Sequence, residues 1–145
     1  MSSEPHYHIE LEDGLESSGL PDMLKDLIGQ NLEQHPEKAA AFRKLNRRIA
    51  LVITDADIEL TLRFSRGSLA IHAGVDADAA IVIRSESDVI MALSNQKMKF
   101  GLPHYFDDTG QEIMAAMKSG RLKVKGLLTH FPSMLRLSRV MSVYP

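Results

Sequence analysis

The sequence predicts an α+β domain in which about five helices cover one face of a mostly antiparallel, five-stranded sheet. Two observations support this fold class. Apolar residues recur at helical spacing between Leu20 and Leu32, and helical segments return in the second half of the chain. Between residues 49 and 73 the apolar period changes to two, which is typical of half-buried strands. A sheet with one polar face must cover its apolar face, and the helices supply that cover.

The first predicted helix begins at Leu20. Its apolar residues form one stripe at helical spacing: Leu20, Met23, Leu24, Leu27, Ile28 and Leu32. Pro36 ends this helix and is suited to the first turn of a second helix, which carries Phe42. The preceding residues 1–19 are acidic and contain few large apolar side chains. We therefore expect a mobile N-terminal arm over 1–19 and a single domain over 20–145.

Five segments alternate as strands. Residues 49–53, 58–64 and 69–73 predict an antiparallel meander of three strands, with turn residues between them. In the middle strand the apolar residues face one side and the polar residues face the other: Ile58, Leu60, Leu62 and Phe64 against Glu59, Thr61 and Arg63. Residues 80–84 predict a fourth strand, and residues 121–125 a fifth.

Helix-start and helix-stop signals delimit the remaining elements. The capping pattern Ser85–Asp88 opens a short helix, with the Ser85 hydroxyl expected to accept an early N–H. A second capping pattern, Thr109–Glu112, opens a helix that Gly120 ends. Thr129 is placed to cap the last helix, whose apolar residues are Phe131, Met134, Leu135, Leu137, Val140 and Met141.

Composition excludes several classes of function. The 145 residues carry a formal charge of −2, so no nucleic-acid partner is expected. The absence of cysteine excludes disulfides, thiolate metal sites and a cysteine nucleophile. Apolar runs are at most five residues long, against the roughly 20 that a membrane-spanning helix needs. The first residues are polar and acidic, unlike a signal peptide, and we expect a cytoplasmic location.

No catalytic or metal-binding pattern is present. The six histidines do not follow a metal-ligand spacing, and the paired aspartates lie at predicted turns and helix starts. Glycine-rich phosphate loops and nucleophile motifs are absent. We therefore expect no catalytic residue, metal or cofactor. If the protein were instead a lipid-modifying enzyme, His104 and His130 would be its candidate residues.

Methionine and positive charge accumulate in the second half of the chain. Six of eight methionines follow residue 90, and residues 97–145 hold eight bases and three acids. Methionine fills irregular space and is common at adaptable binding surfaces. The last helix is apolar on more than one face, so it needs a second apolar contact. That contact is another helix, a bound lipid or a partner subunit.

The segment Gly120–Gly126, a basic strand between two glycines, resembles the strand before the final helix in the sterol carrier protein (type-two) family. The hairpin over 58–74, the strand over 79–83 and the helix over 85–93 follow the family's order, so the resemblance covers residues 23–143. It implies an apolar tunnel between sheet and helices that holds a fatty acyl, sterol-like or isoprenoid lipid, with no metal, cofactor or catalytic residue. Bacterial relatives include accessory factors of isoprenoid quinone synthesis and domains attached to enzymes.

Two sets of residues are the candidate site. The predicted pocket is apolar and lies after the fourth strand: Leu93, Met98, Phe100, Ile113, Met114, Met117, Phe131, Met134 and Met141. Four cations are predicted to meet a lipid headgroup or, transiently, an anionic membrane: Lys123, Lys125, Arg136 and Arg139. The alternative is an interaction or accessory module, in which the methionine-rich surface binds a protein partner or a second copy of the chain.

Overall fold

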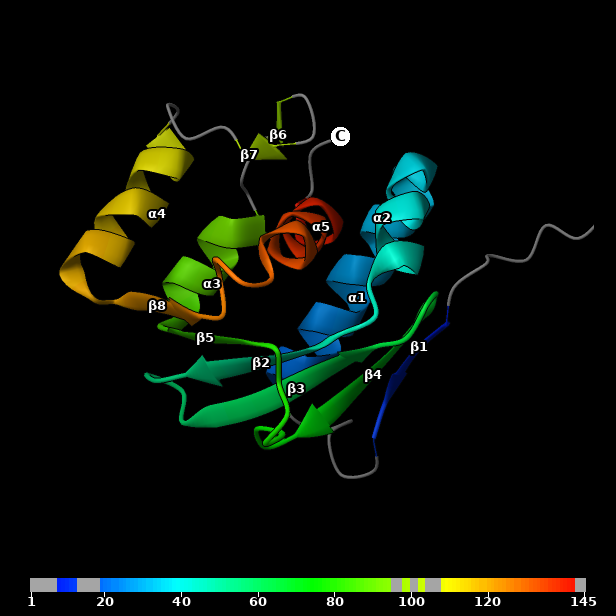
Figure 1. Cartoon of the computed structure of the whole chain (residues 1–145), viewed down its shortest axis with the longest axis horizontal. Helices are drawn as coiled ribbons and strands as arrows, with labels where there is room; N and C mark the ends of the chain where they lie inside the picture. The colour runs from blue at the N-terminus through cyan, green and yellow to red at the C-terminus, as the bar shows by residue number, and fades with distance from the viewer. Residues whose placement is uncertain (1–7, 13–18, 95–97, 100–101, 104–107, 143–145) are drawn as a thin grey trace, which may run out of the picture.

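A six-stranded sheet and a layer of helices on one of its faces make up the structure (Figure 1). The computed structural model describes residues 8–12, 19–94, 98–99, 102–103 and 108–142. Within them the strands of the sheet are β1 (His8–Leu11), β2 (Arg48–Ile53), β3 (Ile58–Phe64), β4 (Ser68–Ala73), β5 (Ile81–Ser85) and β8 (Leu122–Lys125). The predicted α+β class, with helices on one side of the sheet, is confirmed.

The strand order is β1-β4-β3-β2-β5-β8. Pairs β2–β3, β3–β4 and β5–β8 are antiparallel, whereas β1–β4 and β2–β5 are parallel. The sheet is therefore mixed, with the predicted meander at its centre. Two short strands, β6 (Met98–Lys99) and β7 (Leu102–Pro103), pair separately.

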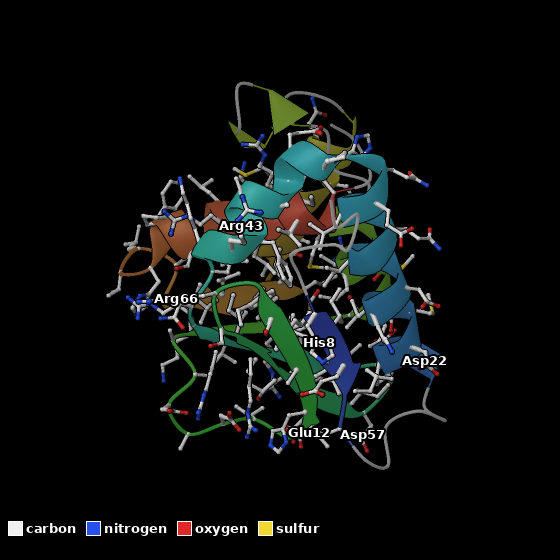
Figure 2. The ribbon with its side chains drawn as sticks, turned by 90° about the vertical axis from the view of Figure 1, so that its right-hand side faces the viewer. His8, Glu12, Asp22, Arg43, Asp57 and Arg66 are labelled. Atoms are coloured by element: carbon white, nitrogen blue, oxygen red, sulfur yellow. The ribbon has the colours of Figure 1, made fainter. Side chains whose placement is uncertain are left out.

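The prediction of five strands missed β1, which lies in the segment expected to be an arm. β1 pairs with the edge of β4 in Figure 2, and Glu12 follows it directly. The Glu12 carboxylate contacts Arg63 at 3.0 Å and the His72 ring at 2.8 Å. A strand of four residues is too short for its alternation to stand out, and its partners are more than 50 residues away in sequence.

Five α-helices and one 3-10 helix lie in the described residues: α1 (Gly19–Gln34), η1 (Pro36–Lys38), α2 (Ala39–Lys44), α3 (Ser87–Ser94), α4 (Asp108–Ser119) and α5 (Phe131–Met141). The five α-helices were predicted within a few residues, whereas the separate 3-10 helix at Pro36 was predicted as the first turn of the second helix. Gly120 ends α4 with φ +81°, as expected for a glycine after a helix.

Two predicted helix caps are not formed: the start of α3 has another partner, and the start of α5 has no side-chain cap. The Asp55 carboxylate, from the β2–β3 turn, accepts hydrogen bonds at 2.8 Å from the Ser87 N–H and hydroxyl. These bonds lower the pKa of Asp55 and satisfy the start of α3, while the Ser85 hydroxyl donates to the Glu86 carbonyl. α5 begins at Phe131, and its N-cap residue is His130 rather than Thr129, with no side-chain capping bond. A capping partner from another element cannot be identified from local sequence.

The core lies between the inner face of the sheet and the helices. α1 contributes Leu24, Ile28 and Leu32, all buried as the helical stripe predicted. Phe42 of α2 packs edge-on against Phe64 of β3, with ring centroids 5.9 Å apart.

The outer face of the sheet carries a network of ion pairs centred on Asp76. Arg63 donates to both carboxylate oxygens of Asp76, at 3.0 and 3.2 Å, and these bonds lower the pKa of Asp76. Arg48 binds Asp78 through both carboxylate oxygens at 3.0 Å. Asp76 and Asp78 thus pair with arginines and fix the loop after β4 against the sheet.

α5 is anchored at its C-terminal end by two polar side chains from the first helical segments. The Asn31 amide donates to the carbonyls of Val140 and Met141, at 2.9 and 3.0 Å. The Lys38 ammonium, which is fully buried, donates to the carbonyl of Ser142. These bonds satisfy carbonyls that a helix end otherwise leaves without partners.

Burial makes the stability contribution of Lys38 depend on pH. Desolvation lowers the pKa of Lys38 from 10.5 to about 8, with nearby Glu37 opposing and Arg139 adding to the shift. Between these two values the unfolded chain binds more protons than the folded chain, so stability rises with pH. Between about pH 7.5 and 9.5, we expect the free energy of unfolding of the wild type to rise by about 1–2 kcal/mol relative to that of Lys38→Met. Urea unfolding of both proteins measures this difference, and a constant difference would contradict the lowered pKa.

Candidate functional site: an apolar pocket under the last helix

An apolar pocket lies between the β5–β8 edge of the sheet and the helices α4 and α5. Its floor is Ile83 of β5 with Leu122 and Val124 of β8, and Ile83 pairs directly with Val124. These strand residues face the helices because alternate residues of β8 point to opposite faces. The remaining lining residues come from α4, the β8–α5 connection and α5: Ile113, Met114, Met117, Leu127, Phe131, Met134 and Leu135.

The pocket is open at one side. Met114, Met117 and Phe131 line it and are 40%, 39% and 43% exposed, so these three side chains form its mouth. All ten lining residues within the described part of the chain are apolar. Such a pocket excludes well-hydrated ligands, because a polar group would lose its hydrogen bonds to water on entry. It favours a hydrocarbon chain or ring.

A cavity of about 170 Å³ is present in this pocket. That volume is close to the roughly 150 Å³ of an engineered apolar cavity that binds benzene. Three of the lining residues are methionines, whose unbranched side chains change rotamer readily. The pocket therefore has space for part of a hydrocarbon chain and walls that can adjust to more of it.

A second apolar groove lies where α1 approaches α3. Its cavity of about 270 Å³ is lined mainly by α1, with Ile90 and Met91 of α3 and Met141 of α5. Met23 and Met91 are exposed at this groove. Asp26 and Gln30 also line it, so this groove is less uniformly apolar than the pocket under α5.

Comparison with known protein families identifies the domain. The model of the SCP-2 sterol transfer family matches residues 25–103, which is more than half of the chain. The chain belongs to the SCP-2 sterol transfer family. The resemblance predicted from the Gly120–Gly126 segment and the order of elements is therefore confirmed at the level of the family.

Solved structures share the fold of this SCP-2 domain. One, described as a UbiJ-SCP2 ubiquinone synthesis protein, has a TM-score of 0.56 at 19% identity. The aligned region covers 81% of this chain and 90% of the other chain. A crystal structure of sterol carrier protein 2 has a TM-score of 0.50 at 15% identity, with the same coverage of both chains. No curated protein sequence matches the chain significantly. At these identities the similarity establishes the fold.

The structure gathers five of the nine predicted pocket residues of this SCP-2 domain. Ile113, Met114, Met117, Phe131 and Met134 all line the pocket under α5. Met141 instead lines the groove between α1 and α3. The side chains of Leu93 and Met98, and the whole of Phe100, lie outside the described residues.

Sequence reasoning missed the other half of the pocket. Ile83, Leu122 and Val124 were assigned only to strands. Leu135 was assigned only to the apolar surface of the last helix, and Leu127 was not singled out. Alternation predicts that Leu122 and Val124 share a face, but it does not distinguish a face that packs from one that lines a cavity. Only the position of α4 and α5 above β8 makes that distinction.

The four predicted headgroup cations of the domain do not form one cluster. Lys123 lines a shallow groove with Arg84 and Arg121, and Lys125 is exposed on the same edge strand. Arg136 lines a separate small cavity, together with Lys44 and other residues. Arg139 lies near the buried Lys38 and contributes to lowering its pKa.

The wide apolar surface of α5 is explained by its neighbours in the domain. α5 packs against α1, α2 and α3, and Leu137, Val140 and Met141 are buried in that contact. Of the three partners considered from the sequence, another helix covers the C-terminal half, while the pocket faces the N-terminal half.

His130, one of the two candidate histidines, does not line the pocket under α5. His130 lines a polar groove with Arg47, Arg48 and Asp78, and His104 falls outside the described residues. Within the described residues no group of three or more metal-ligating side chains comes together. In the same part of the chain, no helix is both long enough and apolar enough to cross a membrane.

Proposed function

We propose that the protein is a non-catalytic lipid-binding or lipid-transfer protein that holds the hydrocarbon part of its ligand in the pocket under α5. Membership of the SCP-2 sterol transfer family supports a lipid ligand. The observation that carries the proposal is the uniformly apolar lining of an open pocket, with Met114, Met117 and Phe131 at its mouth. A fatty acyl, sterol-like or isoprenoid lipid fits that chemistry.

Hydrophobic burial provides the binding energy. Each methylene group transferred from water contributes about 0.8 kcal/mol to binding. A ligand that buries about six methylene groups therefore gains about 5 kcal/mol of binding free energy before the cost of association is subtracted. Micromolar affinity therefore requires more of the chain than the cavity of about 170 Å³ holds at rest. Rotamer changes of Met114, Met117 and Met134 supply the extra length at low cost.

Native mass spectrometry of the purified protein, followed by solvent extraction, tests this function. The proposal expects an added mass of a few hundred daltons, on the order of one lipid, that solvent releases. If the protein is isolated empty, added fatty acid, sterol or isoprenoid quinone should bind with a one-to-one stoichiometry. An empty protein that binds none of these lipids in titration would contradict the proposal.

A second candidate function is an accessory module that binds a protein partner. The groove between α1 and α3 favours it, because Met23 and Met91 expose apolar surface there without lining the pocket under α5. In this case the SCP-2 domain would bury the groove against a partner or a second copy of the chain. Analytical ultracentrifugation tests the second-copy form: a dimer that Met23→Asp dissociates supports it, and a monomer at all concentrations contradicts it.

A further inference from the structure

We propose that the protein docks on an anionic lipid bilayer through a surface beside the mouth of the pocket. This docking surface consists of Lys44, Arg47, Leu128, Phe131 and Arg136. The inference rests on the proposed lipid-binding function, since it names the surface through which the lipid would enter or leave. It replaces the four predicted headgroup cations, of which only Arg136 belongs to this surface.

The apolar part of the docking surface is the connection between β8 and α5. Leu128 is 92% exposed, the most exposed large apolar side chain in the described residues, and Phe131 is 43% exposed. The connection is held in place at its start: Gly126 has φ +85°, and a Cβ there would lie 2.2 Å from the carbonyl oxygen of Ala80. The His130 N–H closes the turn by donating to the Gly126 carbonyl at 2.9 Å. Leu128 is thus presented at the tip of a fixed turn.

The basic part comes from two segments that contain no acidic residue. Residues 43–48 carry four cations, and residues 113–145 carry six. The structure joins these segments, because α2 packs against α5 and a cavity of about 120 Å³ is lined by Lys44, Arg47 and Arg136. Arg47 also lines the larger groove that contains His130, next to the β8–α5 connection.

These cations are not neutralised within the described part of the protein. Arg48 and Arg63 form ion pairs with Asp78 and Asp76, whereas Lys44, Arg47 and Arg136 form none with the described residues. The docking surface is therefore positively charged although the whole chain has a formal charge of −2.

The combination of an exposed apolar tip and surrounding cations matches an anionic bilayer. Leucine and phenylalanine insert into the boundary between headgroups and acyl chains, while lysine and arginine bind the anionic headgroups. Phe131 belongs both to this surface and to the mouth of the pocket. A lipid could therefore pass between bilayer and pocket with little exposure of its hydrocarbon chain to water.

Vesicle co-sedimentation tests the docking surface. We expect the wild type to bind phosphatidylcholine vesicles that contain phosphatidylglycerol, and to bind pure phosphatidylcholine vesicles far more weakly. Each basic residue near such a surface contributes about fivefold in affinity, so Lys44→Glu/Arg47→Glu should lose about 25-fold or more. Leu128→Asp should weaken binding even at high salt, where electrostatic attraction is screened.

A matched control keeps the change in net charge constant. Lys25→Glu/Arg84→Glu alters cations on α1 and on the outer face of β5, and we expect its vesicle binding to stay within about twofold of the wild type. Equal losses in both double variants, or equal binding to neutral and anionic vesicles, would overturn the proposal. So would a wild type that binds no vesicles.

The same proteins separate this proposal from the proposed function. Lys44→Glu/Arg47→Glu should still take up a fluorescent fatty acid from solution, because neither residue lines the pocket. Fatty acid uptake without vesicle binding would leave the lipid-binding function and reject the docking surface. Vesicle binding by a protein that takes up no lipid would leave the docking surface and reject the lipid-binding function.

Discussion

Met117→Trp and Met134→Trp are each expected to abolish uptake of a fluorescent fatty acid while the fold is retained. Both methionines line the pocket under α5, and an indole ring would occupy most of its cavity of about 170 Å³. Every two methylene groups that are kept out reduce affinity by about tenfold. Met117 lies at the mouth and is partly exposed, so its tryptophan variant should lose little stability. Fluorescence titration measures the affinity, and circular dichroism verifies the fold.

The control for these variants is Met91→Trp. Met91 is an exposed methionine of the same helical layer, but it lines the groove between α1 and α3. Its substitution should leave the affinity for fatty acid within about twofold of the wild-type value, because surface changes away from a binding site have small effects. If Met91→Trp blocked uptake and Met117→Trp and Met134→Trp did not, the ligand would occupy the other groove.

Asn31→Leu is expected to destabilise the fold by about 2–3 kcal/mol, because it leaves two carbonyls at the end of α5 without their donor. Asn31 is buried, and its amide binds the carbonyls of Val140 and Met141. Leucine has the same branching and the same number of side-chain heavy atoms, so the substitution leaves no cavity and the loss reports on the missing hydrogen bonds. Gln34→Leu, an exposed amide on the same helix, should change stability by less than about 0.5 kcal/mol.

Near neutral pH, Asn31→Asp should destabilise the fold more than Asn31→Leu does. We expect its free energy of unfolding to be about 3–5 kcal/mol below that of the wild type. A carboxylate would face two carbonyl oxygens and the negative end of the α5 dipole. The pKa of this aspartate would be raised in the folded state, so the variant should regain stability as the pH falls. Urea unfolding at neutral and acidic pH measures this. An aspartate variant that is as stable as the wild type at neutral pH would show that Asn31 does not hold α5.

Much of the fold could be predicted because its signals are local. The stripe from Leu20 to Leu32 predicts a buried helix face, and the structure buries Leu24, Ile28 and Leu32 while it exposes Met23. The alternation over 58–64 predicts buried apolar residues, and the structure buries or partly buries them together with Thr61 of the other face. Gly120 ends α4 as its position after an amphipathic segment predicts. β1 was missed because its place depends on the edge of β4, which lies some 60 residues further along the chain.

The candidate site could be predicted only on its helical side. Clustered methionines indicated α4 and the start of α5, and the structure places Met114, Met117 and Met134 together. The strand side was missed because Ile83 has the pattern of an ordinary core residue. The basic surface was missed because it joins Lys44 and Arg47 to Arg136, about 90 residues away, through the packing of α2 on α5.

Photo-crosslinking with a diazirine fatty acid tests the central claim most directly, since it shows where the hydrocarbon chain lies. The pocket under α5 predicts labelled peptides from α4 and from the β8–α5 connection through Met134. Labelling should disappear when unlabelled fatty acid competes for the site. Competed labelling confined to α1 and α3 would place the ligand in the other groove and contradict the account, as would a protein that gives no competed labelling at all.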